Sequence, residues 1–524
     1  MSLRSVLSSL CLPIAAALLG GCASLPAPVA VAPSHALQDV AATRLARIAR
    51  DNASPDGPGL SGFRLLPEAP SSFNARIALA RRARRSLDVQ YYDLRNDGTG
   101  RQLLRELRDA AQRGVRVRLL VDDLYLGDAG ELFGTLAAHP SIEVRLFNPL
   151  PVRSGALPAR LVLSLHEAVR INHRMHNKLF IADNSFSISG GRNIADEYFM
   201  QDGKTNFIDM DVLATGPVVR AQSDAFDRYW NSAQVRPIEQ VTPPTRPPEQ
   251  AVLRFDELVR GDARGLPENE RDALGRTPVA GQLDAGVLDQ SHARAHVFVD
   301  DPEKIRRGRF EERFAGSVTQ RTLAELETAR TSLFITSPYY VPGEIGLAQV
   351  RRQVERGVRI TVVTNSLAAT DEPLVYAGYA RYRKRLLELG VVLYELSPRL
   401  SQRSGVLGEF GLTTGRLHGK TAVIDNERVF VGSMNLDGRS ASLNTEIGLV
   451  IDSPALAADF ARIISADGFA SAYQVRLGPT GSVEWVERDR SGQVIKVHTD
   501  EPETNWLVQM KNWLLSPWVL EELL

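Results

Sequence analysis

An internal duplication limits the folds open to this chain. Three short patterns occur twice in the same order: A-R-x-S-L starts at Ala83 and Ala329, R-G-V-R at Arg113 and Arg356, and H-x-K at His176 and His418. Each second copy follows its first by 242 to 246 residues. Matches in one order at nearly constant spacing are typical of a duplicated structural unit. With 524 residues, the chain is long enough for two lobes of one architecture.

Each copy alternates helix and strand. In the first copy the pattern predicts helices at 73–84 and 99–112 and strands at 87–92 and 115–121. In the second copy it predicts helices at 320–330 and 348–356 and strands at 333–336 and 358–364. This alternation favours an α/β fold in which each lobe has a mixed, mostly parallel sheet with helices on both faces.

Composition shifts suggest where the lobes begin and end. We place the N-terminal lobe at 61–234 and the C-terminal lobe at 297–470, with a proline-containing linker and inter-lobe segment at 235–296. The remaining 471–524 read as a β-hairpin followed by a tail that contains Trp506, Trp513 and Trp518. Tryptophan at this density suits a membrane interface, and a helix docked on the folded body is the alternative.

The N-terminus resembles a bacterial lipoprotein signal. Residues 1–21 contain one charge, Arg4, and a short apolar run, and small residues precede Cys22. We expect cleavage before Cys22 and lipidation of its thiol, with an Ala/Pro-rich tether at 22–60; plain secretory cleavage is the alternative. The protein is then a lipoprotein of the cell envelope that faces the periplasm. Ala23 after the cysteine favours the outer membrane by resemblance, and the inner membrane is the alternative.

The duplicated H-x-K pattern extends into a longer motif. Each copy reads H-x-K, four residues, D, six residues, two small residues, one variable residue and N. The members are His176, Lys178, Asp183, Gly191 and Asn193 in the first copy, and His418, Lys420, Asp425, Ser433 and Asn435 in the second. In a strand, residues two apart share a face, so each His and Lys project into one pocket. The carboxylates of Asp183 and Asp425 lie at the far end of that strand, where a chemical and a purely structural role are both open.

A pocket with two His, two Lys and two Asn suits a phosphate group. Lys and amide donors hold the non-bridging oxygens and stabilise charge in the transition state. One imidazole can attack phosphorus while the other protonates the leaving oxygen. We expect no cofactor and no metal, since Lys supplies the positive charge and the His and carboxylate spacings match no familiar metal site.

The doubled motif resembles the phospholipase D superfamily. The sequences around His176 and His418, together with Gly190–Phe199 and Gly432–Asp437, are similar to the bacterial cardiolipin synthase branch and within it to the C-type synthases. The resemblance implies an active site between the lobes and transfer through a covalent phosphatidyl-histidine, with His176 as nucleophile and His418 as acid. It implies that Glu446 orients a catalytic histidine. Asp209 is its expected counterpart, because each precedes a proline by eight residues.

Four functions remain open at this point. The first is synthesis of cardiolipin from a phospholipid donor and phosphatidylglycerol or a related acceptor. The second is hydrolysis by the same chemistry, as in a phospholipase D. A nuclease is disfavoured because 62 basic residues balance 62 acidic ones, so we expect phospholipid and membrane partners and no nucleic acid; the oligomeric state stays open. A catalytically silent lipid-binding lipoprotein has no need of the complete motif.

Overall fold

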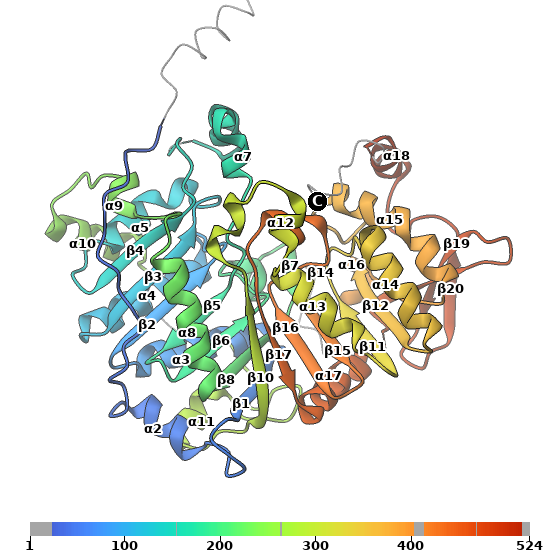
Figure 1. Ribbon diagram of the computed structural model, residues 1–524, viewed down its shortest axis with the longest axis horizontal. Helices are drawn as coiled ribbons and strands as arrows, with labels where there is room; N and C mark the ends of the chain where they lie inside the picture. The colour runs from blue at the N-terminus through green and yellow to red at the C-terminus, as the bar shows by residue number, and fades with distance from the viewer. Residues whose placement is uncertain (1–23, 154, 262–264, 403–412, 468, 516–524) are drawn as a thin grey trace, which may run out of the picture.

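The computed structural model describes residues 24–153, 155–261, 265–402, 413–467 and 469–515. Figure 1 shows two α/β lobes side by side, the N-terminal one in blue and green and the C-terminal one in yellow to red. The expected signal peptide at 1–21, the lipidation site Cys22 and Trp518 lie outside the described residues.

The N-terminal lobe is built on one mixed sheet. Its strands are β1 (Ser61–Leu66), β2 (Ser86–Tyr91), β3 (Arg116–Asp122), β4 (Ile142–Phe147), β5 (Leu179–Ala182), β6 (Phe186–Gly190), β8 (Asp211–Thr215) and β9 (Val235–Pro237). They pair in the order β9-β4-β3-β2-β5-β6-β8-β1. Its helices are α3 (Ala69–Arg82), α4 (Gly98–Gln112), α5 (Gly130–Leu136) after the short η1 (Gly127–Ala129), and α8 (Pro217–Trp230).

The C-terminal lobe repeats this plan. Its strands are β10 (Ser291–Val299), β11 (Ser332–Thr336), β12 (Arg359–Asn365), β13 (Val392–Leu396), β15 (Lys420–Ile424), β16 (Arg428–Gly432), β17 (Ile447–Asp452), β18 (Ala472–Leu477), β19 (Val483–Arg488) and β20 (Val494–His498). Its helices are η4 (Pro302–Arg306), α12 (Phe310–Phe314), α13 (Val318–Glu327), α14 (Gly343–Glu355), α15 (Pro373–Glu388), α16 (Pro398–Ser401), α17 (Pro454–Asp467) and α18 (Trp506–Leu515).

The α/β prediction of two duplicated lobes with mixed sheets is confirmed. Parallel pairing occurs where helices cross between strands, along β2-β3-β4 and β11-β12-β13. The motif strands β5 and β15 pair antiparallel with β2 and β11, and they turn directly into β6 and β16. Gly114 and Gly357, between helix and strand in each copy, share a φ of +87°, a backbone conformation that favours glycine.

The lobes are joined by strand pairing and by a shared core. β1 pairs with β10, so the two sheets are continuous. A small parallel sheet of β7 (Thr205–Ile208) and β14 (Thr414–Leu417) also crosses between the lobes. A hydrophobic cluster between them contains Phe63 and Trp230 from one lobe and Leu449 and Phe460 from the other. This contact fixes the position of each motif relative to the other.

The inter-lobe segment contains more structure than a linker. It holds α9 (Ile238–Val241), α10 (Pro248–Leu258) and α11 (Val279–Ala285), and β10 begins at Ser291, before the predicted lobe boundary at 297. The hairpin expected in the tail corresponds to β19 and β20, which pair antiparallel. An insert of α6 (Leu157–Leu163), η2 (Leu165–Glu167) and α7 (Ala168–Ile171) projects from the N-terminal lobe at the upper edge of Figure 1.

The described part of the tether differs from a free linker. The amide of Ala36 donates to Asp227 Oδ2 at 2.8 Å, and the Ser34 carbonyl accepts from Arg118 at 2.9 Å. Residues Arg44–Asp51 then form the helix α2, which begins at the capping hydroxyl of Thr43. Polar partners on α8 and β3 therefore hold the chain to the N-terminal lobe well before residue 60.

Candidate active site

Each motif histidine is held by backbone contacts to the other lobe. The His176 amide donates to the Thr445 carbonyl at 2.8 Å, directly before Glu446. The His418 amide donates to the Ile208 carbonyl at 2.7 Å, directly before Asp209. Each motif therefore pairs through its backbone with a segment of the opposite lobe. This pairing places each histidine next to a carboxylate from that lobe.

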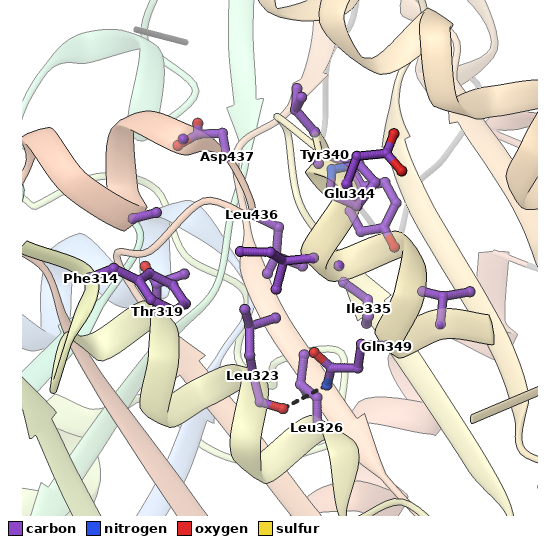
Figure 2. A pocket seen from close by; sticks show the side chains of 18 of the residues that line it. Phe314, Thr319, Leu323, Leu326, Ile335, Tyr340, Glu344, Gln349, Leu436 and Asp437 are labelled. Carbon is purple, nitrogen blue, oxygen red and sulfur yellow. Dashed lines mark hydrogen bonds between the residues drawn. The ribbon is translucent and has the colours of Figure 1, made fainter. Parts of the chain in front are cut away.

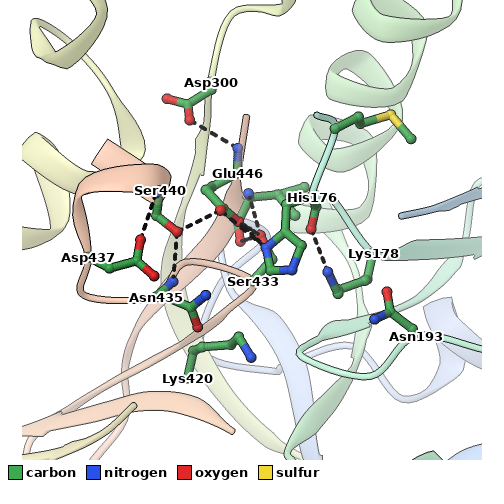
Figure 3. Close-up of polar contacts among 12 residues, drawn as sticks. His176, Lys178, Asn193, Asp300, Lys420, Ser433, Asn435, Asp437, Ser440 and Glu446 are labelled. Carbon is green, nitrogen blue, oxygen red and sulfur yellow. Dashed lines mark hydrogen bonds and ion pairs between the residues drawn. The ribbon is translucent and has the colours of Figure 1, made fainter. Parts of the chain in front are cut away.

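The carboxylates bind the histidine rings. His176 Nδ1 lies 2.9 Å from Glu446 Oε2, and His418 Nδ1 lies 2.6 Å from Asp209 Oδ2. With Nδ1–H donated in this way, Nε2 of each neutral ring is left to react. Ser433 and Ser440 donate hydroxyl hydrogens to Glu446 at 2.5 and 2.8 Å, which orients its carboxylate in turn (Figure 3). Both histidines line one cavity of about 350 Å³.

The equivalent small residues Gly191 and Ser433, which follow β6 and β16, differ for a steric reason. A Cβ added to Gly191 would lie 2.1 Å from Asp209 Oδ1, so only glycine leaves room for that carboxylate. At the equivalent place in the second copy, Ser433 keeps its side chain and donates to Glu446. The two positions thus support their carboxylates in different ways.

The two His–carboxylate pairs are electrostatically unequal. Burial raises the pKa of Glu446 to about 7, although Lys178 opposes the change. Burial also disfavours ionised Asp209, but His418 and Lys420 outweigh it and lower the pKa to about 2. Burial, followed by the neighbouring lysines, lowers the pKa of both histidines, that of His418 to about 4. The resting site therefore holds neutral imidazoles.

The ammonium group of each motif lysine binds the backbone carbonyl of the histidine two residues before it. Lys178 Nζ donates to the His176 carbonyl at 2.8 Å, and Lys420 Nζ donates to the His418 carbonyl at 2.5 Å. Figure 3 shows both ammonium groups and the side chains of Asn193 and Asn435 around the His176 ring. Burial lowers the pKa of Lys178 to about 7 and that of Lys420 to about 8. A bound anion between these groups would offset the positive charge of the two ammonium groups.

These lysine pKa values predict an early alkaline limit for activity. Lys178 and Lys420 lose their charge as pH rises through about 7 to 8, well below the range of an exposed lysine. We expect kcat/KM, which reports the free enzyme, to fall above about pH 7. A bound phosphate stabilises the charged lysines, so kcat should fall only at higher pH. Paired pH profiles test this; limbs at the same alkaline pH would contradict it.

The two motif asparagines differ in the hydrogen bonds that their side chains make. Asn193 Oδ1 accepts from the Asp93 amide at 3.3 Å, and its Nδ2 donates to the Tyr198 hydroxyl at 2.8 Å. Asn435 Oδ1 is buried and has no hydrogen-bond partner among the described residues. A buried amide atom without a partner beside two histidines is placed to bind a ligand.

The motif aspartates bind backbone amides away from the histidines, which favours the structural role over the chemical one. Asp183, one of the predicted catalytic residues, accepts hydrogen bonds from the amides of Arg84, Arg85 and Ser86, at the opposite end of β5 from His176. Asp425 accepts equivalent bonds from the amides of Arg330, Thr331 and Ser332. Both therefore tie the motif hairpin to the start of β2 or β11, and neither lies in the wall of the catalytic cavity. The repeated A-R-x-S-L pattern is their binding partner.

We expect Asp183→Ala to damage stability rather than chemistry. Three backbone amides would lose their acceptor, the Ser86 amide in a buried position and those of Arg84 and Arg85 in partly buried ones, at a cost of about 2–4 kcal/mol in the free energy of unfolding. Activity per folded molecule should change by less than about threefold, the effect of a group remote from the reacting atoms. Chemical denaturation measures the first quantity and active-site titration the second. A thousandfold loss of activity in folded protein would restore Asp183 to the catalytic set.

The cavity wall contains residues that the sequence did not single out. Tyr198 OH lies 3.4 Å from His418 Nε2, and Arg439 binds both the side chain and the carbonyl of Asn172. Tyr92 and Tyr339 also line this cavity, whereas the Tyr91 hydroxyl accepts from Arg76. An alignment of the two copies would have indicated Tyr198 and Ser440, because they occupy equivalent positions five residues after Asn193 and Asn435.

Acidic side chains form much of the remaining wall, namely Asp93, Glu197, Asp371, Glu372 and Asp437. In the described part of the chain, no group of three or more His, Cys, Asp or Glu side chains is arranged to hold a metal ion.

Comparisons with known proteins agree with this architecture. The family model described as "Cardiolipin synthase, PLD-like domain" matches residues 77–230 and 322–467, together more than half of the chain. Cardiolipin synthase C of Escherichia coli is 38% identical over 88% of this chain and 97% of its own length. Cardiolipin synthase A of Pseudomonas fluorescens Pf-5 is 25% identical over 79% of this chain and 69% of its own length. In fold, the chain is similar to a phosphatidylserine synthase of Haemophilus influenzae, with a TM-score of 0.55 at 14% identity, over 92% of this chain and all of the other.

Proposed function

The chain belongs to the phospholipase D-like cardiolipin synthase family, and from this premise we propose that it transfers a phosphatidyl group from a phospholipid donor to phosphatidylglycerol or a related alcohol, forming cardiolipin. One observation carries the proposal. Two histidines from different lobes line one cavity, and a carboxylate from the opposite lobe holds Nδ1 of each. That arrangement provides two nitrogen atoms for a displacement at phosphorus.

The proposed reaction has two displacements. In the first, His418 takes up a proton at Nε2 when the anionic phosphate binds beside it. His176 Nε2 attacks phosphorus, the bond from phosphorus to the headgroup oxygen breaks, and His418 donates that Nε2 proton to the leaving oxygen. In the second, His418 takes the proton of the acceptor hydroxyl, whose oxygen attacks phosphorus, and the phosphorus–nitrogen bond breaks. Lys178 and Lys420 stabilise the charge on the non-bridging oxygens.

The unequal carboxylates support this division of roles. An acid must carry a proton, and ionised Asp209 stabilises the protonated form of His418. Glu446, with a pKa of about 7, stabilises protonated His176 less. His176 is therefore the better nucleophile and His418 the better acid.

Product analysis tests the proposed function. Purified protein in detergent is given labelled phosphatidylglycerol, with and without phosphatidylethanolamine, beside His176→Ala and His418→Ala. We expect cardiolipin from the wild type and none from either variant. Phosphatidic acid as the sole product would make the protein a phospholipase D. Absence of any lipid product, with cleavage of single-stranded nucleic acid, would make it a nuclease.

We further propose that the protein is a lipoprotein of the cell envelope, anchored through Cys22 and facing the periplasm. In the described residues, no helix is long and apolar enough to cross a membrane. Two surfaces support attachment from one side. Val162, Leu163, Leu165 and Val169 are exposed on the α6–α7 insert, and Trp506, Leu507 and Met510 are exposed on α18. Both elements lie at the upper edge of Figure 1, where the described chain begins.

The same surfaces adjoin the catalytic cavity. Arg439, in the cavity wall, donates to Asn172 immediately after α7. Leu374 and Val375, also in the wall, belong to α15, against which α18 packs. Contact with a bilayer along this edge would bring the cavity close to its lipid substrates.

Vesicle assays test the membrane-facing edge. Replacing Leu163, Leu165 and Val169 by serine should lower activity on vesicles about tenfold or more, because less apolar surface is buried in lipid. Activity on detergent-dispersed lipid should stay within about twofold, because the cavity is intact. The exposed Val494 and Ile495 on β20, replaced by serine, are the matched control. Equal losses in both assays would argue against docking.

A further inference from the structure

A second cavity lies in the C-terminal lobe between α13 and α14 and has a volume of about 220 Å³ (Figure 2). Its walls are almost entirely apolar, with Leu323, Leu326, Ile335 and Leu436 among the labelled residues. The lining amide Gln349 donates to the Leu323 carbonyl at 2.7 Å, and Gln353 donates to the Leu326 carbonyl at 2.6 Å. Their polar groups are thus already paired, which leaves a lining suited to a hydrocarbon. We call this space the α13–α14 cavity.

The internal duplication supplies a comparison for this cavity. Isolated bridges link Leu94 to Ile194 in the first copy and Tyr340 to Leu436 in the second. These pairs are separated by the same 242 to 246 residues that separate the repeated motifs. The bridges therefore define equivalent positions at the same place in each lobe.

Aromatic and aliphatic side chains fill the equivalent space in the N-terminal lobe. The rings of Phe73 on α3 and Phe199 after η3 (Asp196–Tyr198) lie 4.9 Å apart, and Leu103 on α4 is fully buried beside α3. At the corresponding positions the C-terminal lobe has Thr319 on α13, Ala441 in η5 (Arg439–Leu443) and Gly346 on α14, which all line the cavity.

Thr319, Ala441 and Gly346 are each smaller than their counterparts in the N-terminal lobe. They belong to three separate elements and line the same cavity. Leu326 and Tyr340 are larger than their counterparts Ala80 and Leu94, yet the cavity persists. Interiors of proteins are normally close-packed, and an apolar void in a core destabilises the fold. A cavity that opens from reductions on three elements of the C-terminal lobe and reaches the surface, where its lining residue Ile345 is 60% exposed, is unlike ordinary packing variation.

Two observations point to the occupant. Asp437 lines both the α13–α14 cavity and the catalytic cavity, so the two spaces share a wall. Thr319 Oγ1 is buried, with 4% of the residue exposed, and has no hydrogen-bond partner among the described residues. A ligand that combines a hydrocarbon chain with a carbonyl oxygen would satisfy both the apolar walls and this hydroxyl.

We propose that the α13–α14 cavity binds one fatty acyl chain of a phospholipid substrate whose phosphate lies between His176 and His418, and that the Thr319 hydroxyl donates to the ester carbonyl. This inference rests on the proposed function and adds a subsite to it. The cavity selects for acyl chain length, because a longer chain removes more methylene groups from water.

Refilling the cavity with the residues of the other lobe tests the proposal. The double variant Thr319→Phe/Ala441→Phe restores the aromatic pair of the N-terminal lobe. We expect kcat/KM for dioleoyl-phosphatidylglycerol in mixed micelles to fall about tenfold or more, the loss expected when two or more methylenes stay in water. For dihexanoyl-phosphatidylglycerol the change should be less than about twofold. Ala348→Phe, on the exposed outer face of α14, is the matched control.

Equal effects on both substrates, or no effect on either, would overturn the acyl site. If the double variant unfolds, the single variant Ala441→Leu replaces it in the same comparison. Photolabelling of otherwise unaltered His418→Ala protein, with phosphatidylglycerol that carries a diazirine on its acyl chain, gives an independent result. Crosslinks on α13, on α14 or on Tyr340 support the site, and crosslinks confined to other elements contradict it. If the wild type transfers no lipid at all, the proposed function fails, while the crosslinks still decide whether the cavity binds an acyl chain.

Discussion

Replacement of either His176 or His418 by alanine should lower the rate of phosphatidyl transfer about 10³-fold or more, because each removes a nitrogen that makes or breaks a bond at the reacting centre. The double variant should be little worse than either single variant, since residues that act as one unit are not additive. Steady-state assays on purified, folded protein measure these rates. His296→Ala, on the exposed side of β10, is the histidine control and should leave activity unchanged.

The result also separates catalysis from binding. Both variants should retain affinity for phosphatidylglycerol, because the lysines and asparagines around the phosphate remain. A variant that binds lipid and turns it over at the wild-type rate would exclude its histidine from the reaction. Loss of binding together with loss of folding would instead show that the histidine holds the lobes together.

Asp209→Asn should reduce kcat by about 10² to 10⁴, the range expected when an orienting carboxylate beside a catalytic histidine becomes an amide. The amide can present its NH2 group to His418 Nδ1, which selects the wrong tautomer, and it removes the charge that stabilises protonated His418. Glu446→Gln should cost less near pH 6, because the pKa of Glu446 is raised to about 7 and its carboxyl is already largely protonated there.

The two carboxylate variants should therefore differ in pH dependence. Above about pH 7, wild-type Glu446 gains its charge and the amide of the variant does not, so the deficit of Glu446→Gln grows as pH rises. The deficit of Asp209→Asn stays constant across neutral pH, because the pKa of Asp209 is about 2. Glu395→Gln, an equally buried carboxylate on β13, is the matched control. Parallel pH profiles for both site variants would contradict the inequality of the pairs.

Local patterns in the sequence predicted much of the fold. The helix predicted at 99–112 corresponds to α4, and the strand at 115–121 to β3, because their periodicity and the following Gly114 are unambiguous. The start of α14 at Gly343 was predicted five residues late, at 348. Gly343 and Gly346 lower helix propensity, and packing of α14 against its lobe overrides that preference.

The sequence predicted which residue types form the candidate site, but it did not predict which of these residues bind one another. The H-x-K spacing indicated that both histidines and lysines meet at a phosphate-binding pocket. The pairing of His176 with Glu446 joins residues 270 apart, and that of His418 with Asp209 joins residues 209 apart. Such contacts depend on how the lobes exchange strands, which no local periodicity encodes. The partners of Asp183 could not be predicted for the same reason, since they are backbone amides that begin a distant strand.

Rapid quenching of His418→Ala with phosphatidylglycerol, followed by mass spectrometry of the His176 peptide, tests whether transfer passes through a covalent phosphatidyl-histidine. Without its acid–base partner, the intermediate should form slowly and break down more slowly still. We expect a phosphatidyl adduct on His176 that is absent from the double variant His176→Ala/His418→Ala and that an added alcohol removes. An adduct on another residue, or slow product formation without any adduct, would contradict transfer through a phosphatidyl-histidine at position 176.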